Sequence, residues 1–134
     1  MDLRDNNRCY VCGLGNPTGL KVAFEIDKAG RSVTASFVPR DDHQGFEGIV
    51  HGGILSALLD EAMAKLAFSL GIPAVTAEIT VTFKTPVAPG DELVITGKLE
   101  KETKKLIEAQ AAIHRGTVLI AQARAKLLTV RRPV

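Results

Sequence analysis

The chain has 134 residues, close to the usual size of one domain and long enough to bury one sizeable core. Its residues are 46% hydrophobic and 24% charged, and 17 basic against 15 acidic side chains leave a net charge of +2, which is ordinary for a globular protein. The basic residues are scattered and there is no Trp and one Tyr, so we expect no nucleic-acid partner.

The N-terminal residues are polar and lack the apolar core of a signal peptide. No apolar run approaches the roughly 18 residues that a membrane-spanning helix needs. We therefore expect a soluble, cytoplasmic protein with no membrane partner. We also expect a single domain over residues 1–134, opening with a loop segment over residues 1–19.

The loop segment carries both cysteines of the chain, as Cys9-x-x-Cys12 followed by Gly13. Such a pair can form a structural turn, make a disulfide or do redox chemistry, or ligate a metal. Tetrahedral zinc needs four ligands, and the sequence offers no second cysteine pair. The histidines lie far away in sequence, at His43, His51 and His114. All three interpretations of the pair stay open.

Alternating apolar residues after this segment predict a β-hairpin that turns at residues 28–30. One strand would place Val22, Phe24 and Ile26 on one face, and the other Val33, Ala35 and Phe37. A loop over residues 39–48 then leads to a helix that starts near Gly52.

The helix is predicted from apolar residues that recur at helical spacing for about 18 residues, until Gly71 and Pro73 end the pattern. The rest of the helix surface divides into two rows of residues. One row has small side chains apart from one acid, which would let a second helix or a ligand come close: Gly53, Ser56, Asp60 and Ala64. In the other row, the four-residue spacing of Glu61 and Lys65 predicts an ordinary surface ion pair.

Four segments with period-two alternation follow the helix, over residues 75–83, 93–100, 106–114 and 118–130. Residues suited to tight turns separate them. Two strands, one long helix and four strands predict an α+β fold, in which an antiparallel β-sheet wraps around one long central helix.

Asp60 is the residue that most needs explanation, because it places a carboxylate on an otherwise apolar helix shortly after a glycine turn. Burying a carboxylate costs several kcal/mol unless it is paired or hydrogen-bonded. We therefore expect Asp60 to have a partner or a chemical task.

Several motifs occur together in this order along the chain. They are the Val50-His51-Gly52-Gly53 turn, an acid nine residues after the histidine at Asp60, the strand Thr76 to Phe83, and the Pro86-x-x-Pro89-Gly90-Asp91 connection. With them the chain resembles the hotdog-fold acyl-CoA thioesterases, in the phenylacetate-pathway-like branch of the 4-hydroxybenzoyl-CoA thioesterase superfamily. The opening cysteine pair with Asn16-Pro17-x-Gly19-Leu20 is similar to the start of one subset of these proteins.

The resemblance implies that a backbone N–H in the glycine turn polarises the thioester carbonyl, while the helix acid attacks that carbonyl or activates a water. Carried over by position, Gly52 is the oxyanion donor, Gly53 packs or assists, and Asp60 is the base or nucleophile. The first N–H groups of a helix suit the donor role, because they lack partners inside the helix and the helix dipole favours negative charge there.

Other site positions keep two interpretations each. His51 either fixes the turn or orients the thioester or water. The resemblance matches Thr76 to a strand position where relatives place a hydroxyl near the acid, and there it either holds the attacking water or is simply a favoured strand residue. Some relatives carry Asn or Gln six residues before the histidine, where this chain has Gly45, so Gln44 or His43 would have to substitute.

Gly52 and Asp60 lie about 12 Å apart along the helix, at 1.5 Å per residue. The donor and the base must each sit roughly 3 Å from the reacting group, so one thioester cannot use both from the same helix. We therefore predict a homodimer in which facing antiparallel helices complete two sites, and a dimer of dimers beyond it.

Apolar and basic residues predict where the acyl-CoA substrate binds. Phe46, Phe68 and Phe83 favour a pocket for an aromatic or medium-length acyl group. The candidate ligands of the CoA phosphates, which could equally be solvated residues at strand ends, are Lys84, Lys101, Lys104, Lys105 and Arg115. The resemblance implies no metal and no cofactor, since CoA is part of the substrate.

Two alternative functions remain from the sequence. One is a hotdog hydratase or dehydratase acting on an acyl thioester, although the Pro-Gly entry into the helix that is usual there is absent from this chain. The other is a non-catalytic module that binds acyl thioesters, although pure binding does not require a carboxylate at the reacting carbon.

Overall fold

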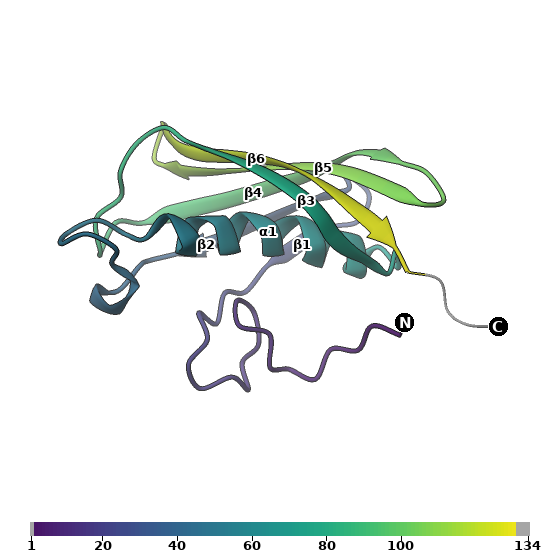
Figure 1. Cartoon of the computed structure of the whole chain (residues 1–134), viewed down its shortest axis with the longest axis horizontal. Helices are drawn as coiled ribbons and strands as arrows, with labels where there is room; N and C mark the ends of the chain where they lie inside the picture. Colours follow the sequence, from purple (N-terminus) through teal and green to yellow (C-terminus); the bar gives the residue numbers. More distant parts are fainter. Residues whose placement is uncertain (1, 131–134) are drawn as a thin grey trace.

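The computed structural model describes residues 2–130, which fold as one antiparallel sheet curved over a long helix (Figure 1). The elements in chain order are β1 (Glu25–Asp27), β2 (Ser32–Phe37), the 3-10 turn η1 (Asp41–His43), α1 (Gly52–Ser69), β3 (Ala74–Phe83), β4 (Leu93–Glu102), β5 (Leu106–Arg115) and β6 (Val118–Thr129). The predicted α+β hotdog architecture is confirmed. Residue 1 and residues 131–134, the ends of the expected domain, lie outside the described residues.

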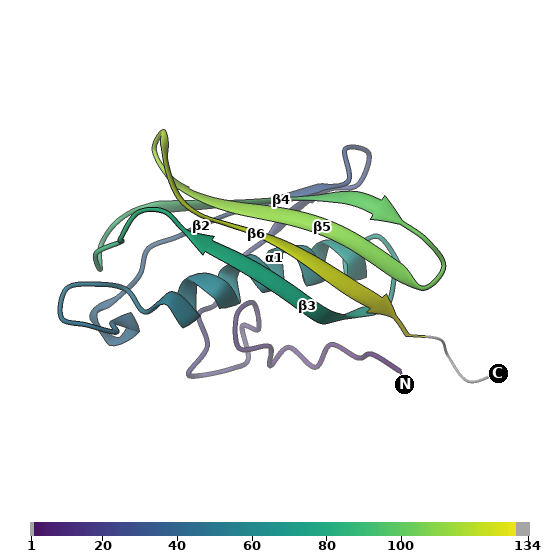
Figure 2. The ribbon, with the colours of Figure 1, turned by 45° about the horizontal axis from the view of Figure 1, so that its top comes forward.

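The strand order is β1-β2-β4-β5-β6-β3, so β3 lies at one edge of the sheet although it directly follows the helix in sequence. Figure 2 shows β3 on the near edge, running alongside α1. The pairing of β3 with β6 shifts register between Thr76 and Glu78, which marks a β-bulge. Bulges bend a strand and re-aim a side chain, and this one directly follows a candidate site residue.

The core lies between α1 and the sheet. Strand β4 alternates strictly between buried and exposed residues over its first eight positions, and its buried side faces the helix. Helix and sheet approach closely at Gly97, where an added Cβ would lie 2.8 Å from Val33 Cγ1 and 3.7 Å from the Cβ of Ala62. The largest fully buried aliphatic side chains of this layer are Leu58, Leu59, Met63, Leu66, Leu93, Ile95, Ile107, Ile113, Ile120 and Leu127.

Helix α1 begins at Gly52 and ends at Ser69, as predicted. Its C-terminus is closed by Gly71 with φ of +79°, a left-handed conformation that glycine adopts without a steric penalty. No helix within residues 2–130 is long and apolar enough to cross a membrane.

The predicted hairpin of β1 and β2 forms, but its first strand covers only residues 25–27. Val22 is buried, and its N–H donates to the carbonyl of Val11 in the N-terminal segment instead of to a strand. The N-terminal segment thus takes the place of a longer hairpin, and it runs along the side of α1 that faces away from the sheet (Figures 1 and 2).

Candidate active site

Asp60 has the partner that its position on the helix requires. Thr76 in β3 donates a hydrogen bond from Oγ1 to Oδ1 of Asp60 at 2.7 Å, and both residues are half-buried. Within residues 2–130, Oδ2 of Asp60 has no hydrogen-bond donor. The carboxylate is therefore held through one oxygen, and the other has no donor among the described residues.

The His51-Gly52-Gly53 turn forms the N-terminus of α1. His51 is the N-cap residue, and its Nδ1 accepts a hydrogen bond from the N–H of Gly53 at 2.7 Å. This contact satisfies one of the helix's unpaired N–H groups. The N–H of Gly52 finds no acceptor in the part of the chain that the structure describes, so the turn presents one donor at the positive end of the helix.

The loop before the helix holds this turn in place. The N–H of His51 donates to the carbonyl of His43, whose ring is buried and accepts from the N–H of Arg40 through Nδ1. Burial lowers the pKa of His43, and the nearby Arg40 lowers it further. His43 therefore supports the loop as a neutral ring.

Gln44 supports the same loop. Its side chain donates to the carbonyl of Asp41 at 2.7 Å and accepts from the N–H of Gly48 at 2.6 Å. Both ends of the amide are thus engaged within the loop, and contact of Gln44 with the substrate stays a prediction.

The end of β3 lies beside the helix N-terminus. A Cβ added to Gly52 would lie 3.3 Å from Cζ of Phe83, so the phenyl ring covers the glycine closely. Lys84 follows directly and is exposed, and its N–H donates to the carbonyl of Ile120. The structure therefore brings Phe83 and Lys84, two of the predicted substrate-binding residues, to the Gly52 end of the helix.

The predicted three-phenylalanine pocket does not form within one chain. Phe46 is 84% exposed at the tip of its loop. Phe68 lies near the other end of α1 from Phe83, since residues 52 and 68 are about 24 Å apart along the axis at 1.5 Å per residue. A pocket that uses all three side chains would have to combine two copies of the chain.

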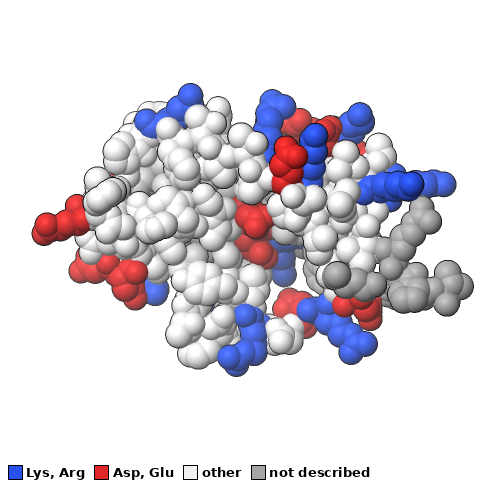
Figure 3. All heavy atoms as spheres, viewed as in Figure 1, with Lys and Arg blue, Asp and Glu red and all other residues white. Residues whose placement is uncertain are grey.

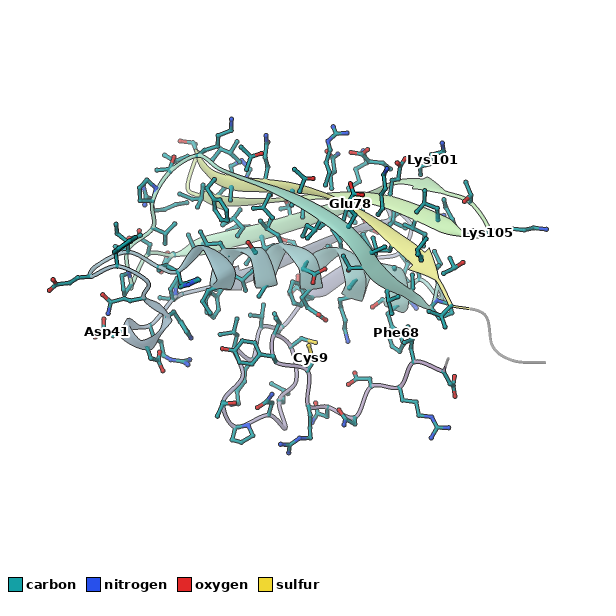
Figure 4. The ribbon with its side chains drawn as sticks, viewed as in Figure 1. Cys9, Asp41, Phe68, Glu78, Lys101 and Lys105 are labelled. Carbon is teal, nitrogen blue, oxygen red and sulfur yellow. The ribbon has the colours of Figure 1, made fainter. Side chains whose placement is uncertain are left out.

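The candidate phosphate ligands also lie apart. Figure 4 shows Lys101 and Lys105 at the end of the sheet opposite to Asp41, whose loop adjoins the helix N-terminus. Arg115 is engaged with Asp91, whose Oδ2 accepts from the Arg115 guanidinium at 2.9 Å and from the N–H of Ala88 at 3.0 Å. Of the five basic residues, only Lys84 follows directly on a residue that contacts Gly52.

Two hollows among the described residues contain none of the predicted catalytic residues. One, of about 970 Å³, lies on the outer face of the sheet, where its lining includes Thr96, Gln110 and Gln122. The other, of about 380 Å³, lies between the N-terminal segment and α1. Asp60 and Gly52 are thus on the same helix, and neither of these two hollows is lined by either residue.

The surface around the N-terminal half of α1 is poor in charge. In the view of Figure 3 most of the left half is uncharged, with acidic side chains at its left edge and near the middle of the molecule, while Lys and Arg are more numerous toward the right. Such a face suits contact with a second protein surface, because few charges would have to leave water.

Glu61 differs from its prediction as a surface partner of Lys65. Its Oε1 accepts a hydrogen bond from the Cys12 thiol at 3.3 Å, while Lys65 reaches Asp5 at 3.8 Å. Burial raises the pKa of Glu61, and burial together with the Glu61 charge raises the pKa of the Cys12 thiol. The sequence alone does not indicate this contact, because Cys12 lies in the N-terminal loop and Glu61 on α1, and no sequence pattern links the two positions.

Comparisons with known proteins show which family the chain belongs to. Residues 47–121 match the family described as the thioesterase superfamily. Acyl-coenzyme A thioesterase 13 of Mus musculus is 33% identical over 103 residues, which cover 74% of this chain and 74% of the mouse protein.

Two solved structures share the fold at low identity. A mutant of the phenylacetic acid degradation protein PaaI from Thermus thermophilus aligns with a TM-score of 0.75 and 20% identity, over 83% of this chain and 95% of that one. A hypothetical thioesterase protein from Streptococcus pneumoniae, solved with coenzyme A, aligns with a TM-score of 0.76 and 18% identity, over 84% and 88%. The family match spans the glycine turn, Asp60 and Thr76, and the chain belongs to the thioesterase superfamily.

Proposed function

We propose that the protein hydrolyses acyl-CoA thioesters with aryl or medium-length acyl groups, releasing the carboxylic acid and free CoA. The hydrogen bond from Thr76 to Asp60 carries this proposal, because it holds a carboxylate on the helix with one oxygen left to react. The mouse relative is an acyl-coenzyme A thioesterase, and the Streptococcus pneumoniae neighbour was solved with coenzyme A, which supports CoA as the thiol.

In the proposed reaction, Oδ2 of Asp60 either takes a proton from the attacking water or attacks the carbonyl itself. The carbonyl oxygen becomes negatively charged as the tetrahedral centre forms, and the N–H of Gly52 donates to it. Preorganised donors of this kind supply a large share of such catalysis, since they are aimed at charge that develops only in the transition state. The C–S bond then breaks, and CoA leaves as the thiolate and takes up a proton. When water is the nucleophile, this step gives the carboxylic acid directly. When Oδ2 is the nucleophile, it leaves a mixed anhydride on Asp60, which water then hydrolyses to release the acid and restore the carboxylate.

The Gly52 and Asp60 that act on one thioester come from two copies of the chain, for the reason of distance given above. Three features of the described residues support such a dimer: β3 is an unpaired edge strand next to α1, the helix row that includes Gly53 and Ser56 is small, and the surrounding face is mostly uncharged. In this arrangement, Phe83 would line the acyl end of the site, because its ring lies against Gly52.

The direct test is release of free thiol from a panel of aryl- and acyl-CoA esters by the wild type and by Asp60→Asn. We expect this substitution to lower kcat by more than about 100-fold with little change in KM, because it removes the charge that acts in the transition state. Asp41→Asn, on an exposed turn, is the matched control and should retain wild-type turnover. Asp60 is the wrong acid if Asp60→Asn retains most of the turnover while Glu61→Gln abolishes it.

A further inference from the structure

The Cys9-x-x-Cys12 turn, which the proposed function does not use, lies against α1 with both sulfurs near one carboxylate. The thiols are free, and the Sγ atoms of Cys9 and Cys12 and a carboxylate oxygen of Glu61 all lie within 4.8 Å of one another. Figure 4 shows Cys9 below α1, with its sulfur directed toward the helix. Two thiols from a loop thus converge with one acid from a helix.

These separations fit a metal ion that touches all three atoms. Tetrahedral zinc with Zn–S of about 2.3 Å and Zn–O of about 2.0 Å requires S···S near 3.8 Å and S···O near 3.5 Å. Sγ of Cys12 and Oε1 of Glu61 are already 3.3 Å apart. Small movements of the Cys9, Cys12 and Glu61 side chains would therefore let all three bind one ion.

The backbone of the turn is shaped for thiolate ligands. The N–H of Cys12 points to Sγ of Cys9 at 3.5 Å, and the N–H of Gly13 donates to the carbonyl of Cys9 at 2.9 Å. Gly13 is required here, because an added Cβ would lie 2.4 Å from the backbone nitrogen of Cys9. The tight turn holds the two sulfurs on one side, and hydrogen bonds to metal-bound sulfur are a usual means of orienting such ligands.

The electrostatics favour a divalent cation. When Cys9 and Cys12 are ionised, they and Glu61 place three negative charges in a partly buried space, where unpaired charge is costly. The cavity of about 380 Å³ that they line also has basic residues at its wall, and Lys65 among them already pairs with Asp5. A zinc ion would neutralise most of the remaining charge, and the cavity leaves room for water as a fourth ligand.

We propose that Cys9, Cys12 and Glu61 bind one zinc ion per chain and that this ion fixes the N-terminal segment to helix α1. Two thiolates and one carboxylate are ligands that zinc accepts, and the thiol protons go to solvent when the ion binds. The site tethers residue 61 of the helix to a segment that otherwise contacts the core through a few buried side chains, such as Val11 and Leu20.

The test uses the full chain, purified under reducing conditions without chelator, then stripped and titrated with Co²⁺ and with Zn²⁺. We expect one equivalent of either metal per chain and, with cobalt, the intense visible and thiolate charge-transfer bands of a tetrahedral site. Glu61→Gln should weaken binding by more than about tenfold, since it removes a ligand. Glu92→Gln, an exposed glutamate in the loop before β4, is the control and should bind like the wild type.

Three outcomes would overturn the proposal. The first is cobalt uptake by the wild type without thiolate bands, and the second is unchanged affinity in Glu61→Gln. The third is a Cys9–Cys12 disulfide that forms readily in the presence of excess zinc. Cys12→Ser serves as a further variant, and the wild-type cobalt spectrum decides the question even if that variant fails to fold.

Discussion

At the scale of single residues, the proposed mechanism depends on the hydrogen bond between Thr76 and Asp60. The hydroxyl holds Oδ1 of the acid and so sets the direction in which Oδ2 points. The bulge in β3 that follows Thr76 sets the direction of this side chain in turn.

Thr76→Val should therefore lower kcat by roughly 10- to 100-fold, because a hydrogen bond to a charged group contributes about 1.5–3 kcal/mol. Thr76→Ser keeps the hydroxyl and should keep most of the turnover. Steady-state kinetics of thiol release on both variants is the measurement. Equal losses in the two variants would assign Thr76 a packing role instead.

Gly52 can be tested by removing its N–H without removing the helix. Proline is favoured at the first position of a helix, and His51 before it has an extended backbone, with ψ of 132°, that a following proline tolerates. Gly52→Pro should lower kcat by about 10²–10³, as expected for loss of an oxyanion donor. Gly52→Ala meets the same Phe83 ring but keeps the N–H, so it isolates the effect of the donor. Similar activity in both variants would exclude this N–H from catalysis.

At the scale of elements, α1 could be predicted closely from sequence because its apolar spacing, its glycine turn and Gly71 are local signals. The strands from β3 to β6 were predicted within two residues for the same reason. Neither the place of β3 at the sheet edge nor the contact of Cys12 with Glu61 could be predicted, because both depend on segments that meet only in the folded chain. The contact between Thr76 and Asp60 could be expected only from the family resemblance, not from the residues themselves.

The row of small residues on α1 leads to a prediction about assembly. If Gly52 of one helix faces Asp60 of the other and the reverse, the two-fold axis passes near Ser56, so two copies of Ser56 face each other there. Ser56→Arg should give monomers without thioesterase activity, since it places bulk and like charges on the axis, whereas Ser56→Ala should stay dimeric and active. Sedimentation and thiol release check both variants. An active Ser56→Arg dimer would place the interface elsewhere.

At the scale of the whole molecule, the proposed mechanism gives each chain two halves of a site rather than a complete site. The proposed Gly52 donor and Asp60 acid lie on one helix, about 12 Å apart along its axis at 1.5 Å per residue. Catalysis is then a property of the assembly, and each dimer would hold two equivalent sites related by its two-fold axis.

The measurement that tests this most directly is the activity of a heterodimer made from Asp60→Asn and Gly52→Pro chains, purified through two different tags. Each homodimer of these variants lacks an essential group at both sites, whereas the heterodimer unites an intact Gly52 with an intact Asp60 at one of its two sites. We predict about half of the wild-type turnover per dimer for the heterodimer, with both homodimers nearly inactive. A heterodimer as inactive as the two homodimers would contradict a site shared between chains.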